Sequence, residues 1–392
     1  MAEATDPQPV DRRSTAQRST DRRSPGKPEL GRGERVLPGV FRLRLPLPWP
    51  GVPHCNAWAV AAGNGVVLFD TGMHQPGSLA QLERAMQMCG LTIEDVRLVV
   101  CTHAHSDHYG QAASIVRRTG CELWMHPNHA HMKLAAEDPD AALERRLEVA
   151  RQSGVPEEPL RRYAAERGRA GIGSGVSAVI APDRELLPGV VVETDLGPWA
   201  VHETPGHAPS HVCLFQPEHR LLISGDHLLG RVFPFFDFGY SPDPVGEFLS
   251  SLDVIETLHA RLCLAGHGRT FTDVDAHIEG NRELVAEHLA KVIAAMRGEG
   301  AEGGGEAERG AEGGDGAERG GRGEGGGEAE VRGEGEAGEP PTAFEILPRV
   351  YGSHLTPMTA QWLLTETLAM LRHLEVTGRA RRISGEPERW TA

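Results

Sequence analysis

Residues 102–108 read THAHSDH, and this stretch limits the fold more than any other part of the chain. It follows VRLVVC at 96–101, a β-branched apolar run that predicts a buried strand. Three imidazoles and one carboxylate share the loop that leaves this strand: His103, His105, His108 and Asp107. Imidazole and carboxylate groups are ligands suited to zinc, iron or manganese. The loop therefore predicts a metal site, in which the first two histidines point to one side and the Asp–His pair serves a second position.

Three further candidate ligands come later in the chain, each beside a glycine and next to a predicted strand end. His207 lies in TPGHAPSH, Asp226 lies in SGDH after the apolar LLI, and His267 lies in AGHG after LCL. A single histidine-rich loop could arise by chance on a protein surface. Four loops that each place candidate ligands at a predicted strand end are harder to explain without a metal. Together they predict a metal cluster with the ligand order H-x-H-x-D-H, H, D, H.

Short apolar runs and helical patterns alternate around these motifs. Strands are expected at 36–45, 57–61, 66–69, 96–102, 121–125, 187–194, 199–203, 211–216 and 221–224. Helices are expected at 78–89, 111–119, 128–170, 248–259 and 275–296. The charged helical segment 128–170 separates two β-rich halves, and this pattern favours a layered sandwich of sheets and helices. The predicted fold class is therefore α+β.

Two segments have compositions unlike the rest of the chain. Residues 1–35 are polar and without periodicity, which predicts a disordered tail. Residues 298–340 consist mostly of glycine and glutamate, which predicts a solvated, disordered linker. Within it, 299–339 hold 13 acidic residues and four arginines, so −9 of the net charge of −15 lies there and only −6 elsewhere. The catalytic domain is therefore expected at 36–297.

The last segment, 341–392, is expected to form a small winged-helix-like module. Helical patterns cover 342–351 and 356–377, and 379–390 predicts a β-hairpin. A unit of about 50 residues is marginally stable on its own, so we expect it to dock on the main domain. Winged helices often bind nucleic acid, but six arginines are balanced here by five glutamates. A structural or homodimer role is therefore favoured over nucleic-acid binding.

Composition limits the cellular compartment in which such a protein is expected. Hydrophobic residues make up 39% of the chain, enough for a core, but no apolar run approaches the roughly 20 residues that span a bilayer. The N-terminus lacks the apolar stretch of a secretory signal. The six cysteines are scattered and form no CxxC pair, which is typical of reduced thiols. We therefore expect a cytoplasmic protein without a membrane partner.

In this combination of motifs the chain resembles the metallo-β-lactamase superfamily, from about residue 36 to 296. Five motifs, beginning with LFDTG at 68–72, stand in that family's order and spacing. The resemblance implies an αββα sandwich with two metal ions in a cleft at one edge of the sheets. It implies these ligands: His103, His105 and His207 for metal one, Asp107, His108 and His267 for metal two, and Asp226 as a bridge. Asp70 is similar to the family's aspartate that orients the ligands without binding metal.

Two such metals would supply hydrolytic chemistry. They are expected to be zinc, with iron or manganese as alternatives, and they share a hydroxide whose parent water has a pKa near 7. This hydroxide attacks a carbonyl or phosphoryl centre, and the metals neutralise the charge that develops on oxygen. The catalytic carboxylates are then Asp107, which accepts or passes the proton, and the bridging Asp226. Hydrolysis is the expected reaction class, because no serine or cysteine nucleophile is needed.

The resemblance also narrows the kind of hydrolase. Penicillin-degrading members typically lack the bridging aspartate, so β-lactam hydrolysis is not the expected main activity. Only 40 residues separate Asp226 from His267, too few for the inserted domain of the processing nucleases. The C-terminal segment resembles the winged helix of one lactamase-like subgroup. That subgroup includes thioesterases acting on carrier-bound acyl chains and a single-stranded-RNA endonuclease.

The expected substrate is therefore a small-molecule or carrier-linked thioester, ester or lactone. A thioester suits the site because a thiolate leaves without a strong general acid. A metal-dependent single-strand endoribonuclease is an alternative, but it needs a basic groove that the charge of −6 outside the acidic segment does not indicate. A non-catalytic, metal-stabilised regulatory or binding protein is the other alternative, and the intact ligand set argues against it.

Other residues near the motifs carry weaker signals. The segment GRVFPFFDFGYSPDP follows the bridging aspartate and predicts either an apolar pocket wall or ordinary core packing. Its candidate wall residues are Phe233, Phe235, Phe236 and Tyr240. His211 lies four residues after His207. It is expected either to contact the substrate or donate a proton to it, or to position the metal ligands without binding metal. HPNHAH at 126–131 lacks a carboxylate or glycine context and predicts a polar helix start, while 128–170 is either a lid or a surface insertion.

Overall fold

A computed structural model describes residues 30–49, 51–170, 175–230, 235–299, 339–352 and 357–392. The expected tail at 1–29, most of the expected linker at 300–338, and Phe233 lie outside the described residues.

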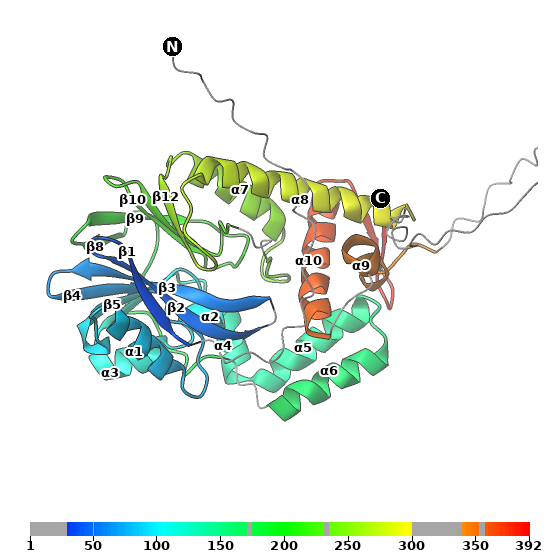
Figure 1. Cartoon of the computed structure of the whole chain (residues 1–392). Helices are drawn as coiled ribbons and strands as arrows, with labels where there is room; N and C mark the ends of the chain where they lie inside the picture. Colours follow the sequence, from blue (N-terminus) through cyan, green and yellow to red (C-terminus); the bar gives the residue numbers. More distant parts are fainter. Residues whose placement is uncertain (1–29, 50, 171–174, 231–234, 300–338, 353–356) are drawn as a thin grey trace, which may run out of the picture.

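Two β-sheets lie at the centre of the molecule (Figure 1). The first sheet contains, in spatial order, β1 (Arg32–Leu37), β2 (Val40–Trp49), β3 (Val52–Ala62), β4 (Gly65–Phe69), β5 (Val96–Cys101), β6 (Glu122–Met125) and β7 (Arg184–Glu185). The second contains β12 (Leu262–Ala265), β11 (Leu221–Gly225), β10 (Val212–Gln216), β9 (Gly197–Glu203) and β8 (Val191–Thr194). Strands β4 to β7 pair in parallel, as do β11 and β12. Neighbouring parallel strands end at the same edge of their sheet, which is where the predicted ligands follow.

Helices cover the outer face of each sheet, which confirms the αββα sandwich (Figure 1). They are α1 (Ser78–Met88) and α3 (Ala112–Thr119) on the first sheet, and α7 (Pro244–Glu256) and α8 (Val274–Met296) on the second. An apolar cluster that includes Leu82 lies under α1, and another that includes Phe248 lies under α7. A third cluster, around Trp58 and Trp199, joins the inner faces of the two sheets. Three packed interfaces therefore stabilise the four layers.

Strand β5 shows why the chain can present THAHSDH at one fixed place. Val99, Val100 and Cys101 are fully buried, because β5 is paired on both sides and covered on both faces. Parallel strands buried in this way are rich in β-branched residues, as the sequence predicted. The following loop enters the short helix α2 (Ser106–Tyr109), so the ligand-rich loop begins from the fully buried end of a strand that is paired on both sides.

The helical segment expected at 128–170 consists of three helices. They are α4 (Ala130–Glu137), α5 (Pro139–Gln152) and α6 (Glu157–Ala170). Asp138 begins α5 by accepting a hydrogen bond from the backbone N–H of Ala141 at 2.9 Å, and Pro139 occupies the first helical turn. At the other end of α5, the carbonyl of Ser153 accepts from the N–H of Phe344 at 3.0 Å. The helices therefore connect the sandwich to the C-terminal segment.

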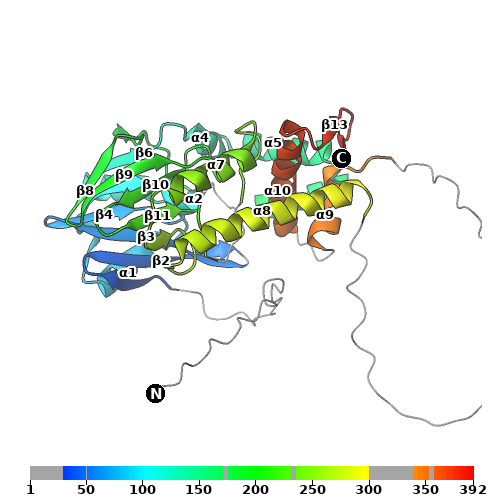
Figure 2. The ribbon, with the colours of Figure 1, turned by 90° about the horizontal axis from the view of Figure 1, so that it is seen from above.

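That C-terminal segment consists of two helices and a hairpin: α9 (Ala343–Tyr351), α10 (Pro357–Val376), β13 (Arg381–Ile383) and β14 (Arg389–Thr391). Ile346, Leu371 and Leu374 are fully buried in the same apolar cluster as the residues under α7 and α8. Figures 1 and 2 both place α9 and α10 beside the end of α8. The segment docks on the main domain as expected, whereas its assignment as a winged helix stays a prediction.

The start of the folded chain corrects one expected boundary. Strand β1 begins at Arg32, inside the stretch assigned to a disordered tail ending at residue 35, and it pairs with β2. A Cβ atom on Gly33 would lie only 1.9 Å from the carbonyl oxygen of Ala85 in α1. Glycine therefore lets this polar edge strand contact the backbone of α1. Because the strand packs there through a glycine, its sequence lacks the alternation of apolar and polar residues that would have predicted it.

Two expectations from composition can be compared with the structure. All six cysteines lie in the described part of the chain and are free thiols. Among the described residues, no helix combines the length and apolar character needed to cross a membrane.

The shared apolar cluster predicts that the C-terminal segment and the sandwich unfold together. Replacing the fully buried Leu374 by alanine should lower the free energy of unfolding by about 2–5 kcal/mol. The matched variant Val376→Ala, at a side chain that is 53% exposed on the same helix, should change it by less than about 0.5 kcal/mol. Urea denaturation followed by circular dichroism measures both. Two separate transitions, with Leu374→Ala affecting only a minor one, would show an independent module instead.

Candidate metal centre

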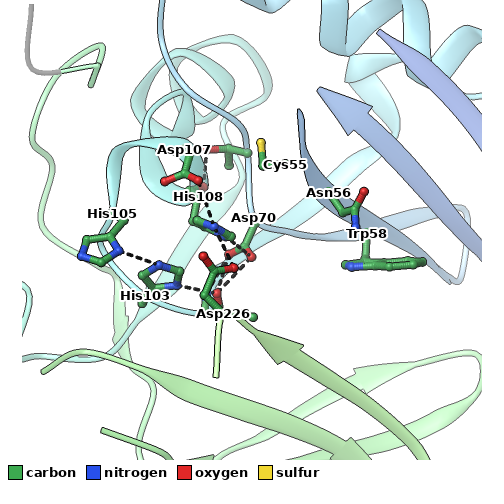
Figure 3. A network of polar contacts seen from close by, with 12 residues as sticks. Cys55, Asn56, Trp58, Asp70, His103, His105, Asp107, His108 and Asp226 are labelled. Atoms are coloured by element: carbon green, nitrogen blue, oxygen red, sulfur yellow. Dashed lines mark hydrogen bonds and ion pairs between the residues drawn. The ribbon is translucent and has the colours of Figure 1, made fainter. Parts of the chain in front are cut away.

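All seven predicted ligand side chains belong to two close groups at one edge of the sandwich. Figure 3 shows His103, His105, Asp107, His108 and Asp226 of these groups. His103 follows β5, Asp226 follows β11 and His267 follows β12, while His207 lies on the loop between β9 and β10. Their candidate ligand atoms form two groups, and within each group all atoms lie within 4.8 Å of one another. The groups are His103, His105 and His207, here called set one, and Asp107, His108, Asp226 and His267, here called set two. Six of the seven residues are buried and His105 is half-buried.

The nitrogen atoms of set one converge closely. His105 Nδ1 lies 3.1 Å from His103 Nε2 and 2.9 Å from His207 Nε2. The opposite edges of two rings donate hydrogen bonds: His207 Nδ1–H to the carbonyl of Phe235 at 2.7 Å, and His105 Nε2–H to Asp237 at 2.7 Å. In neutral imidazole only one nitrogen carries a hydrogen. The inward nitrogens of these rings therefore bear lone pairs aimed at one point, as a metal ion requires.

His103 is oriented through two linked groups. The Thr102 hydroxyl donates to the Asp70 carboxylate at 3.0 Å, so it is free to accept from His103 Nδ1–H, also at 3.0 Å. Asp70 additionally accepts from the backbone N–H of Thr102 at 2.8 Å and from His108 Nδ1–H at 2.8 Å. One buried carboxylate thus fixes a ring in each set. This is the orienting position that the sequence indicated for Asp70.

Set two combines two rings and two carboxylates. His267 Nε2 lies 3.2 Å from Asp107 Oδ2 and 3.0 Å from Asp226 Oδ2, and its Nδ1–H donates to the carbonyl of His54 at 2.9 Å. His108 Nε2 lies 3.3 Å from one oxygen of each carboxylate. Asp226 Oδ2 is also 3.7 Å from His207 Nε2 of set one. Asp226 therefore lies between the two sets, where a bridging ligand belongs.

Two buried atoms of set two have no hydrogen-bond partner among the residues that the structure describes. They are His108 Nε2 and Asp226 Oδ1, which lie 3.3 Å apart without forming a hydrogen bond. Buried polar atoms are nearly always satisfied, so a nitrogen and an oxygen that face each other without a hydrogen bond mark a place for positive charge: a proton on His108 in the metal-free chain, or a metal ion that takes both atoms as ligands. Together with the lone pairs of set one, these atoms fit two divalent metal ions.

The charges of the site agree with metal binding. Burial disfavours the charged form of His267, but the carboxylates of Asp226 and Asp107 outweigh burial and raise its pKa to about 10. His108 behaves alike: burial opposes its charge, and the same carboxylates raise its pKa well above the usual value. Burial dominates at His207 in set one and lowers its pKa to about 4. Set two therefore attracts positive charge, which metal ions would supply in place of protons.

His211 and Asn56 lie next to the ligand sets and bond to the backbone of the ligand loops. His211 Nε2 accepts from the backbone N–H of Asp226 at 3.1 Å, and its Nδ1–H donates to Thr204 at 2.8 Å. Asn56, on β3, donates to the carbonyl of Ala265 at 2.9 Å, just before His267. Both side chains are buried. They position the backbone of ligand loops, so the suggested substrate contact of His211 has no support in this geometry.

The structure corrects one residue of the expected aromatic wall and leaves the others as predictions. Phe236 is fully buried and packs on Phe248, with ring centroids 5.3 Å apart, so it is a core residue and not a pocket residue. Phe235 is half-buried, and its ring centroid lies 6.1 Å from that of His207. Tyr240 is 51% exposed and lines a separate small cavity. Phe233 lies outside the described residues.

The sequence did not indicate Asp237 or His131 as parts of this site. Asp237 stands among aromatic residues, and only its bond to His105 reveals it. His131 belongs to HPNHAH, which was expected to be no more than a polar helix start, yet its ring centroid is 6.0 Å from that of His105. His105, His131 and Asp237 form a third close group. Asp237, from a distant segment, supplies the carboxylate that HPNHAH itself lacks.

Comparison with known proteins agrees with this geometry. A model of the metallo-beta-lactamase superfamily matches residues 50–267, which is more than half of the chain and contains all seven ligand side chains. The chain belongs to the metallo-beta-lactamase superfamily. The family resemblance expected from the motifs is thereby confirmed, and the chain is a superfamily hydrolase with a His/Asp cluster suited to divalent metals.

Individual relatives in the metallo-beta-lactamase superfamily are distant. The chain is 25% identical to the probable metallo-hydrolase YqjP of Bacillus subtilis, over 61% of this chain and 75% of that protein. It is 22% identical to the atrochrysone carboxyl ACP thioesterase of Aspergillus chevalieri, over 69% of this chain and 70% of that protein.

Solved structures show the fold over a longer part of the chain. A metallo-beta-lactamase family protein from Thermus thermophilus has a TM-score of 0.70 at 24% identity, and the match covers 91% of this chain and 99% of that one. A beta-lactamase domain protein from Burkholderia ambifaria has a TM-score of 0.67 at 24% identity, over 92% and 93%. The likeness in fold therefore extends beyond residues 50–267.

The network behind the ligands predicts how metal affinity responds to two substitutions. Asp70→Asn should weaken both metal positions by about 10–100-fold, because Asp70 orients a ring in each set. Asp237→Asn should weaken only one position, because its carboxylate bonds only His105 among the ligands, and its backbone N–H donates to the carbonyl of His207, which belongs to the same set. Asparagine also tolerates the positive φ of 62° at residue 70. Titration of the metal-free chain with zinc against a chromophoric chelator measures each step.

The surface variant Asp253→Asn, at a carboxylate that is 71% exposed, provides the control and should keep both affinities. Equal metal affinities in the wild type and Asp70→Asn would contradict the orienting role of that carboxylate.

The raised pKa values of set two predict proton release on metal binding. His108 and His267 are protonated at neutral pH in the metal-free chain, and a metal can bind only the neutral ring. Metal affinity should therefore increase as the pH rises from 7 toward 10, the range over which His267 loses its proton. Calorimetric zinc titrations at about pH 7.5 in two buffers of different ionisation enthalpy should give different heats. His267→Ala should release one proton fewer, and identical heats in both buffers would rule the mechanism out.

Proposed function

We propose that the protein is a dinuclear metal-dependent hydrolase of thioesters, esters or lactones, with zinc as the first choice of metal. The observation that carries this proposal is the pair of ligand sets joined at Asp226, which lies within 4 Å of rings from both sets. Five imidazoles present an inward nitrogen to these sets while the other nitrogen donates to a protein acceptor. A site that only stabilised a fold would not need two adjacent metal positions with a shared carboxylate.

The nucleophile is best assigned to water. Cys55 is drawn beside Asp107 in Figure 3, but it is fully buried, and burial raises the pKa of its thiol far above the usual range. A thiol is a good nucleophile only as thiolate. Two metal ions would polarise the substrate carbonyl and lower the pKa of a bound water to about 7.

The side chains of the site then have distinct tasks. Asp226 keeps the two positions adjacent, and Asp107, whose Oδ2 is 3.2 Å from His267 Nε2, is placed to take the proton that the attacking water loses. Both carboxylates have strongly lowered pKa values, because the positive rings of His108 and His267 outweigh burial. They are therefore ionised at neutral pH, as a proton acceptor and a bridging ligand must be.

A carrier-linked acyl thioester is the substrate class that we place first. The relative from Aspergillus chevalieri is named as a thioesterase of an acyl carrier protein. A thiolate leaves without protonation, so cleavage of a thioester does not depend on a strong general acid. RNA is the less favoured substrate: Arg382, in the C-terminal hairpin, is paired with Glu375 and Glu388 at 3.6 and 3.1 Å, which reduces the positive charge that this surface offers to phosphate.

Asp226→Ala provides the test of this mechanism. The variant should lose about 10²-fold or more in kcat/KM, because metal stabilisation of the developing charge contributes several kcal/mol. The wild-type chain should contain about two metals and hydrolyse butyryl thioesters, aryl esters or lactones in a chelator-sensitive reaction, followed by thiol release or by chromatography. Circular dichroism should show that the variant stays folded.

Asp253→Asn again provides the control and should keep full activity. Activity that survives Asp226→Ala would exclude the two-metal mechanism. Cleavage of labelled single-stranded RNA alone would move the protein to the nuclease alternative, and two bound metals without turnover on any substrate would favour a binding protein.

A further inference from the structure

The metal centre is most accessible to solvent beside His105. The side chain of His105 is 16% exposed, and so is that of Asp237, which accepts its hydrogen bond. The side chains of the other six ligands are at most 9% exposed. A substrate therefore approaches the two ligand sets on the side of His105.

A cavity of about 260 Å³ lies on this same side of the metal centre. It is lined by Asn128, Ala130, His131, Arg145, Pro209 and Tyr240. His131 connects the two places, because its ring centroid is 6.0 Å from that of His105 and 5.3 Å from that of Tyr240. The cavity is thus two ring contacts away from set one. This separation is too large for the reacting carbonyl itself, but a long substrate can span it.

Two arginines on α5 make this side of the opening positive. Arg145 lines the cavity, and both Arg145 and Arg146 are exposed. Their charges act on Tyr240: burial and the charge of Asp237 raise the pKa of its hydroxyl, and the two guanidinium groups oppose this rise. Among the residues that the structure describes, neither arginine has an ion-pair partner.

The sequence of α5 leaves these two charges without a neutralising acid. Residues three and four apart are neighbours on the surface of a helix, and around Arg146 all of these positions hold alanine, leucine or valine. The acid three residues after Arg145 is Glu148, whose two oxygens accept from Arg151 at 3.3 Å and Gln152 at 2.9 Å. In a chain with a net charge of −15, an unneutralised pair of arginines beside the metal centre indicates an anion site.

The chemistry of the cavity favours phosphate as this anion. Guanidinium groups remain charged at every pH at which the protein is folded, and they donate paired hydrogen bonds to phosphate oxygens. Tyr240 and Asn128 line the same cavity and carry neutral donors. None of the six lining residues is an acid that would repel an anion.

We propose that the cavity and the two arginines bind a phosphate group that the substrate carries at the far end of its thiol arm. The inference rests on the proposed thioester hydrolysis and narrows the substrate to thioesters of phosphopantetheine, whose long neutral arm joins the sulfur to a phosphate. The thioester carbonyl then lies at the metals, and the arm passes His105 and His131 to reach Arg145.

Two matched substrates test the role of the phosphate. Butyryl pantetheine and butyryl 4′-phosphopantetheine differ only in that group. For the metal-loaded wild type, kcat/KM should be about tenfold or more higher for the phosphorylated substrate, mainly through a lower KM, because hydrogen bonds to a charged group contribute this much. The preference should decrease as salt is added, because both arginines are exposed. Equal kcat/KM values at low salt would overturn the inference.

Arginine variants test the site itself. The double variant Arg145→Gln/Arg146→Gln should reduce the preference to within about twofold, while metal content and hydrolysis of butyryl pantetheine stay unchanged. Arg145→Lys/Arg146→Lys, which restores the charges, should recover part of the preference. The matched control is Arg84→Gln/Arg117→Gln, because these exposed arginines lie on α1 and α3 and not at the cavity. An unchanged preference in Arg145→Gln/Arg146→Gln would refute the site.

Free coenzyme A and a carrier protein both present this arm and phosphate. Butyryl coenzyme A and a butyryl-loaded acyl carrier protein are therefore compared in the wild type and in Arg145→Gln/Arg146→Gln. The substrate with the higher kcat/KM identifies the source, and its hydrolysis should decrease about tenfold in the variant. If the substitutions weaken only the binding of labelled single-stranded RNA, the arginines serve the nuclease alternative and the inference is wrong.

Binding of non-hydrolysable analogues separates this inference from the proposed function. S-butyl pantetheine and S-butyl 4′-phosphopantetheine, which are thioethers, are titrated calorimetrically into the wild type and Arg145→Gln/Arg146→Gln. If no thioester is hydrolysed, the proposed function fails, yet tighter binding of the phosphorylated thioether that the variant abolishes still supports the site. Tighter binding that the variant keeps would place the phosphate at the metals instead and refute the site, even in an active thioesterase.

Discussion

Five imidazoles stand beside two buried carboxylates, and the arrangement depends on what lies behind each ring. Burying an unpaired polar group is costly, so every ring needs an acceptor on its outer edge. Thr102 and Asp70 serve two of them, while Asp237 and the carbonyls of Phe235 and His54 serve the others. These acceptors come from β3, from the ends of β4 and β5, and from the segment after β11. The ligand geometry is therefore a property of both sheets together.

The ligands and their supports were not equally predictable from sequence. The ligands lie in short motifs where polar residues follow apolar strands, so THAHSDH, SGDH and AGHG are visible without a structure. Two supports are backbone carbonyls, which leave no trace in residue identity. Asp237 is one acid within an aromatic segment, and its role follows only from the fold that brings it to His105. Contacts between distant segments are what sequence patterns lack.

The same division holds for the fold. Strongly apolar strands such as β5, and the amphipathic α8, were predictable because burial dictates their composition. Strand β1 was missed because it is a polar edge strand whose Gly33 packs against the backbone of α1. The break between α4 and α5 was missed as well, because a charged helical pattern hides the cap that Asp138 provides. Local sequence patterns therefore predicted that these helices and strands exist. The residues at which they begin and end depend on caps and on contacts between distant segments.

The apolar cluster under α7 and α8 also includes residues of α9, α10 and the final hairpin. Helix α8 ends at Met296 and α9 begins at Ala343, and both residues of this junction are buried in that cluster. The attraction between the two parts comes from this buried surface and not from the covalent path through 300–338. If a protease cut the chain in that interval, the two fragments should stay associated. The two parts could then also be expressed as separate polypeptides that assemble into one folded protein.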